Sequence, residues 1–80
     1  MLRKSERLNQ FKNFKNLPLL KYGLYVEIDH KYHGYLTDID GDYIIVSNGI
    51  EKSPFHPTWE TVYYDNPIDK NIIYDFRSEK

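Results

Sequence analysis

The sequence predicts a mainly β domain, a small, partly open, five-stranded antiparallel barrel preceded by an α-helix. Three observations predict this fold class. The chain of 80 residues is long enough for one domain with one compact core. From residue 24, apolar and polar residues alternate with the period of two that a half-buried strand requires. The dipeptides Asp40-Gly41 and Asn48-Gly49 are typical of tight turns between antiparallel strands.

Residues 2–16 predict the helix, because apolar residues recur mostly at intervals of three and no Gly or Pro interrupts them. These apolar residues are Leu2, Leu8, Phe11 and Phe14. Pro18 ends the helix, since the residue before a proline is disfavoured in the helical conformation. We expect a stripe of Leu8 and Phe11, extended by Phe14 or Leu17, to pack against the rest of the domain or against a partner.

Five later segments predict the strands, over residues 24–29, 35–39, 43–47, 59–64 and 71–76. In the first of them, Leu24, Val26 and Ile28 share one face and should enter the core. Residues 30–33 predict a polar connection, and 50–58 a loop, because proline cannot donate to a sheet ladder. The expected organisation is a basic helix and linker over 1–21, the barrel over 22–76 and a frayed tail over 77–80.

A resemblance to known proteins rests on three pieces of sequence. The segments 23–28 (GLYVEI) and 33–36 (HGYL), followed by the Asp40-Gly41 turn, resemble the opening of SH3-like small β-barrels, including KOW and Tudor-type modules. The likeness covers roughly residues 22–65. The chain is also similar in its Asn-, Lys-, Tyr- and Ile-rich composition to small SH3-like proteins of Gram-positive bacteria and their prophages. The resemblance implies binding of nucleic acid or peptide rather than catalysis.

The composition indicates where in the cell the protein works and which kinds of site it lacks. The chain contains no cysteine, which excludes disulfides, thiolate metal sites and cysteine nucleophiles. No apolar run approaches the roughly 18–20 residues of a membrane span, and the first ten residues are too polar for the core of a signal peptide. We therefore expect a cytoplasmic protein.

No motif in the sequence fixes a reaction, a metal or a cofactor. Three carboxylates alternate in a pattern that superficially resembles a calcium loop, but its glycine is misplaced and strands flank it; they are Asp38, Asp40 and Asp42. Nothing in the pattern fixes the geometry of a zinc site on the three histidines, His30, His33 and His56. The serines lack a nucleophile elbow, and the single glycines form no phosphate-binding loop. We expect no enzyme activity, no metal and no cofactor.

The formal net charge of -1 conceals a strong asymmetry. Residues 1–21 carry six basic residues and one acidic residue, a net +5, so residues 22–80 carry -6. A basic segment of this kind predicts an anionic partner, and the leading hypothesis is a small DNA- or RNA-binding accessory protein of the kind that phages carry. The predicted phosphate contacts are Arg3, Lys4, Arg7, Lys12 and Lys15, and the predicted stacking residues are Tyr25, Tyr35 and Trp59.

A second hypothesis of a different class remains open. The domain could instead be a protein–protein interaction module or a host-enzyme inhibitor, acting through the acidic barrel or the Phe11/Phe14 stripe. The chain would be a monomer or a weak homodimer. The basic helix could also simply lie against its own acidic body, and the tyrosines could complete the core. Pairing of its lysines with Asp38, Asp40 or Asp42 would favour either this internal packing or a protein partner over nucleic acid.

Overall fold

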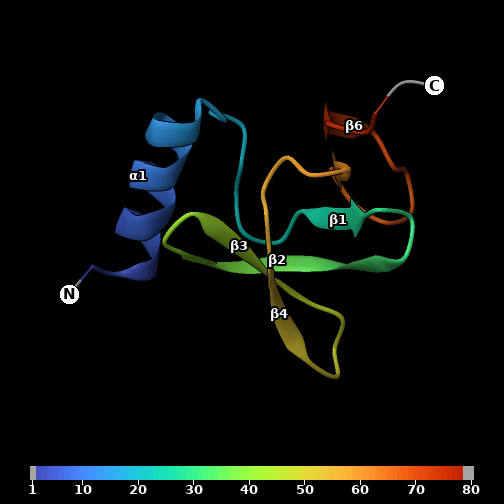
Figure 1. The fold of residues 1–80 in the computed structure, drawn as a ribbon, viewed down its shortest axis with the longest axis horizontal. Coiled ribbons are helices and arrows are strands. Elements are labelled where there is room, and N and C mark those ends of the chain that lie inside the picture. Colours follow the sequence, from blue (N-terminus) through green and yellow to red (C-terminus); the bar gives the residue numbers. More distant parts are fainter. Residues whose placement is uncertain (1, 79–80) are drawn as a thin grey trace.

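The computed structural model describes residues 2–78, which form one helix and six strands (Figure 1). The elements are α1 (Lys4–Lys15), β1 (Tyr25–Ile28), β2 (Tyr32–Asp40), β3 (Tyr43–Ser47), β4 (Lys52–Phe55), β5 (Thr61–Tyr64) and β6 (Ile72–Asp75). All six strands belong to one antiparallel sheet. The predicted mainly β fold with an N-terminal helix is therefore confirmed at this level.

Helix α1 begins and ends close to the predicted positions. The backbone N–H of Arg3 donates to the carboxylate of Glu6 over 2.9 Å, which satisfies a donor that the first turn leaves unpaired. At the other end, Asn16 adopts the left-handed conformation, with φ 60° and ψ 49°, and stops the helix. Pro18 then prevents any continuation.

The sheet has the strand order β4-β3-β2-β1-β5-β6. Strands β1 to β4 follow one another as a meander, and the chain then returns so that β5 pairs with the free side of β1. Figure 1 shows β4 crossing the direction of β2 steeply, as expected for a strongly twisted sheet. Within the described chain the sheet is open, and its two edges are β4 and β6.

The prediction of five strands is wrong, because β4 lies in the segment predicted as a loop. The N–H of Asn48 donates to the carbonyl of Glu51, so residues 51, 53 and 55 turn their backbone groups toward β3. The nitrogen of Pro54 consequently faces away from β3. A proline at this position of an edge strand removes no ladder hydrogen bond, which is why two prolines nearby do not prevent the strand.

Strand β2 begins earlier than predicted, since Tyr32 and His33 belong to it rather than to a polar connection. The turn between β1 and β2 needs fewer residues than the sequence pattern indicated. Asp29 and His30 both adopt positive φ, 54° and 59°, as the tight primed turns of hairpins do. The pairing of Glu27 with His33 then follows directly.

The core contains the predicted face of β1. Leu24, Val26 and Ile28 are all buried, so the predicted strand register is confirmed. Gly34 of β2 lies opposite Val26, and a Cβ atom on Gly34 would collide with the carbonyl of Ser47. Close approach of β2 and β3 therefore requires glycine at this position.

Helix α1 packs on the core through Phe11, which is buried, whereas Phe14 is 77% exposed. Steps of three residues fall about 60° short of a full helical turn, so a stripe at this spacing drifts around the helix. Leu8 packs partly against the core, and Leu17 extends the contact beyond the helix end. The predicted Phe11/Phe14 stripe is wrong as one surface, because its two rings face core and solvent respectively.

The two phenylalanines should differ sharply in their contribution to stability. Phe11→Ala should lower the free energy of unfolding by about 3–5 kcal/mol, because it leaves a cavity under the helix. Phe14→Ala should change it by no more than about 0.5 kcal/mol. Urea unfolding of both variants measures the difference. Similar losses in the two variants would mean that the helix packs through another face.

Candidate functional site

The structure distributes the predicted site residues over three places. The basic residues lie on and before α1, beside the β2–β3 hairpin. Tyr25 and Tyr35 are cross-strand neighbours on the sheet face opposite the core. Trp59 lies in the connection between β4 and β5. The predicted residues therefore do not form one continuous site.

Arg7 holds α1 against the end of β2. Its Nη2 donates to Asp38 Oδ1 over 2.8 Å, its Nε to the carbonyl of Ile39 over 3.2 Å, and its Nη1 to the carbonyl of Leu2 over 2.8 Å. Burial by itself would raise the pKa of Asp38, but hydrogen bonds from Arg7 and from the Ile39 N–H outweigh it and leave that pKa below its ordinary value. Three donor groups of Arg7 are thus engaged within the chain.

Two further basic residues of the helix also contact the chain itself. Lys15 Nζ lies 3.5 Å from Asp42 Oδ1 in the β2–β3 hairpin. Lys4 Nζ lies 5.2 Å from the centre of the Tyr22 ring, and the Tyr22 hydroxyl donates to the Lys4 carbonyl over 2.6 Å. Of the five predicted phosphate contacts, only Arg3 and Lys12 form neither an ion pair nor a cation–π contact with another described residue.

Three tyrosines from three strands form a row of neighbouring rings on the side of the sheet opposite the core. Tyr25 of β1 lies between Tyr35 of β2 and Tyr64 of β5, with ring centres 5.8 and 5.9 Å away. His33 adds a fourth ring 6.0 Å from Tyr25. Tyr35 is 45% exposed, Tyr25 is half-buried and Tyr64 is buried. We call Tyr25, Tyr35, Tyr64 and His33 the tyrosine face.

A hydrogen bond to Glu27 holds Tyr64, the buried member of the tyrosine face, in place. The Tyr64 hydroxyl donates to Glu27 Oε1 over 3.2 Å, and Lys70 Nζ lies 3.6 Å from Glu27 Oε2 and 5.9 Å from the centre of the Tyr64 ring. Burial and then the charge of Glu27 raise the pKa of both Tyr25 and Tyr64. Tyrosine hydroxyls are protonated at neutral pH even without this shift, so both can donate hydrogen bonds.

The sequence predicted Tyr25 and Tyr35 as binding residues but missed Tyr64 and His33. Periodicity alone places Tyr64 and Val62 on one face of a strand, yet it does not say which strand lies beside them. That Tyr64 lies beside Tyr25 follows only from the pairing of β5 with β1. His33 was assigned to a loop, and its place on the face follows from the early start of β2.

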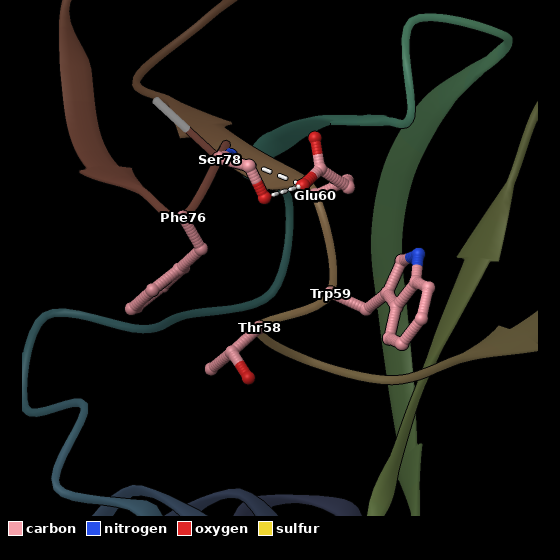
Figure 2. A pocket seen from close by; sticks show the side chains of 5 residues that line it. All are labelled: Thr58, Trp59, Glu60, Phe76 and Ser78. Carbon is pink, nitrogen blue, oxygen red and sulfur yellow. Dashed lines mark hydrogen bonds between the residues drawn. The ribbon is translucent and has the colours of Figure 1, made fainter. Parts of the chain in front are cut away.

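Trp59 lies apart from the tyrosine face, with no ring contact to it among the described residues. It lines a pocket of about 220 Å³ together with Thr58, Glu60, Phe76 and Ser78. Figure 2 shows the indole directed away from Phe76, while the backbone N–H and the hydroxyl of Ser78 both donate to the Glu60 carboxylate.

The predicted frayed tail covers residues 77–80. Arg77 donates hydrogen bonds to Asp75 and Ser78 to Glu60, while residues 79 and 80 lie outside the described part of the chain. Over residues 2–78, no group of three or more His, Asp or Glu side chains is arranged to hold a metal ion. No helix in this range has the length and apolar character needed to cross a membrane.

Comparisons with protein-family models, curated proteins and solved structures found no match. What the chain binds has to be inferred from its own surface.

The contact between Arg7 and Asp38 predicts a specific loss of stability in acid. Folding lowers the pKa of Asp38, so the ionised carboxylate stabilises the fold at neutral pH, and this contribution is lost as the pH falls from about 4 through the lowered value. The thermal midpoint of Asp38→Asn should be lower at pH 7 but should fall less on acidification than that of the original protein.

Asp65→Asn is the matched control, because Asp65 forms no ion pair with any described residue. It should follow the acid profile of the original protein. Parallel profiles for the original protein and Asp38→Asn would show that Asp38 does not carry the acid dependence.

Proposed function

We propose that this domain is a non-catalytic protein-interaction module that binds its partner through the tyrosine face. The observation that carries this proposal is the contact of three tyrosine rings across β2, β1 and β5, with Tyr35 open to solvent. Tyrosine is enriched at protein interfaces because it combines a large apolar ring with a hydroxyl that can hydrogen-bond.

The tyrosine face is ordered before it meets a partner. Tyr25 is held between two neighbouring rings, and the hydroxyl of Tyr64 is held by Glu27, which also pairs with Lys70. Side chains that are already fixed lose little rotational freedom on binding. The exposed part of Tyr35 can therefore contact a partner with little loss of conformational entropy.

The arrangement of charge favours a protein partner over nucleic acid. Affinity for nucleic acid comes largely from lysine and arginine side chains that neutralise phosphates. Here Arg7 and Lys15 already pair with Asp38 and Asp42, and these carboxylates are engaged in turn. The same pairs weaken the alternative in which the acidic body itself inhibits a host enzyme, since two of its carboxylates face the helix.

We propose that the twisted sheet is a partly open, SH3-like barrel, supported by the return of β5 to the side of β1 and by the steep crossing of β4 over β2 (Figure 1). A partly open barrel leaves its edge strands unpaired. Strand β6 would then be an addition beyond the five barrel strands.

Tyr35→Ser tests the proposed function, with Tyr43→Ser as its matched control. Both tyrosines lie on strands and are about half exposed, 45% and 51%, but Tyr43 is not part of the tyrosine face. Proteins captured by the immobilised domain are identified, purified and titrated against each variant. Tyr35→Ser should raise the Kd of the true partner about tenfold or more, and Tyr43→Ser should leave it unchanged.

Binding of oligonucleotides decides between the two classes of partner. Fluorescence anisotropy with single- and double-stranded DNA and RNA should show no tight binding at moderate salt. A log–log salt slope of about -3 to -4, together with loss of binding on replacing Arg3 and Lys12 with Gln, would overturn the proposal in favour of nucleic acid. Equal effects of Tyr35→Ser and Tyr43→Ser on a protein partner would also overturn it.

A further inference from the structure

The two edges of the sheet differ in how they are protected. Strand β4 carries Lys52 and Pro54, whereas β6 carries neither lysine nor proline and presents Ile72, which is 52% exposed. An edge strand with free backbone groups and apolar side chains pairs readily with another strand, and proteins usually block such edges with lysine, proline or a covering element. No other strand among the described residues lies beyond β6.

The hydrogen bonds of β6 show which of its backbone groups are free. The N–H of Phe76 donates to the carbonyl of Thr61, and the N–H of Asp65 donates to the carbonyl of Asn71. In an antiparallel pair, positions that hydrogen-bond to the neighbouring strand alternate with positions that do not, and the bulge between Tyr63 and Tyr64 shifts this alternation by one residue. The backbone groups of residues 71, 74 and 76 therefore point toward β5. The N–H and C=O groups of Ile72 and Asp75 consequently point away from the sheet.

At the opposite edge, the outward positions of β4 are Lys52 and Pro54. Pro54 has no N–H to donate, so this edge offers an incoming strand an incomplete set of partners. Lys52 adds a charge beside it. The sheet thus has one edge that accepts a strand and one that resists it.

We propose that β6 pairs in antiparallel fashion with β6 of a second copy of this chain, about a two-fold axis. Ile72 of each copy then lies opposite Asp75 of the other, so that the outward backbone groups of the two strands meet. Ile73 and Tyr74, which pack partly on the core, bring apolar surface to the same seam. This inference rests on the sheet edges and is independent of the proposed function.

Pairing with a second copy explains why β4 carries Lys52 and Pro54 whereas β6 carries neither lysine nor proline. Once two β6 strands pair, the edges that remain in the joined sheet, as far as residues 2–78 define it, are two β4 strands, and each carries Lys52 and Pro54. Association therefore stops at two copies. With two accepting edges, the same chain would assemble into open filaments.

Charge substitutions at Ile72 test both the contact and its register. Ile72→Glu places like charges opposite Asp75 twice in the dimer, where Arg77 is already engaged with the Asp75 carboxylate. It should raise the dimer dissociation constant about tenfold or more. Ile72→Lys places opposite charges there and should leave the dimer as tight or tighter. Ile50→Glu is the matched control, because Ile50 is 93% exposed in the β3–β4 turn and should not affect association.

Sedimentation equilibrium over a wide range of protein concentration gives the readout, with circular dichroism confirming that each variant is folded. The average mass of the original protein should rise from 9.7 kDa to twice that value and no further. A monomer up to millimolar concentration, growth beyond two copies, or equal weakening by Ile72→Glu and Ile72→Lys would each overturn the proposal.

Amide hydrogen exchange supplies a second readout that does not depend on any variant. The N–H groups of Ile72 and Asp75 should become protected as the protein concentration rises, because only pairing between copies covers them. If the dimer forms but these amides exchange at a rate that does not depend on protein concentration, the contact between copies lies elsewhere and the proposal is wrong.

Discussion

Strand β1 lies between β2 and β5, and its pairing with β5 joins segments that are far apart in the sequence. One side of this ladder sets Val26 against Tyr63 in the core, and the other sets Tyr25 against Tyr64 on the opposite face of the sheet. Because neighbouring residues of a strand face opposite sides, a single register decides both arrangements. A slip of one residue would bury the tyrosine face and expose the core.

The charge asymmetry of the chain is partly neutralised within the fold. Helix α1 brings its basic side chains to the β2–β3 hairpin, where Arg7 meets Asp38 and Lys15 meets Asp42. The apolar contact through Phe11 determines how the helix lies, and the ion pairs add orientation because they sit in partly exposed positions. A net charge counted along the sequence therefore overstates the charge that the surface presents.

The two proposals are compatible in space. An antiparallel pair of β6 strands is related by an axis perpendicular to the sheet, so both copies present their tyrosine faces on the same side of the joined sheet. Ile72 lies opposite Tyr64 in the next strand, which places the seam beside the row of tyrosines. A dimer would then offer a partner two copies of the same surface, and a divalent partner would gain from both.

The sequence by itself determined the local features: the helix with its end before Pro18, the turn at Asp40-Gly41, and the alternation that buries Leu24, Val26 and Ile28. It also indicated Tyr25 and Tyr35 as candidate binding residues, because each is an aromatic residue on a predicted strand. Only the tertiary structure decided that residues 52–55 form an edge strand, that Phe11 and Phe14 separate, and that Tyr64 joins the tyrosine face. These outcomes depend on which distant segment lies beside each residue, and a periodic pattern carries no information about that neighbour.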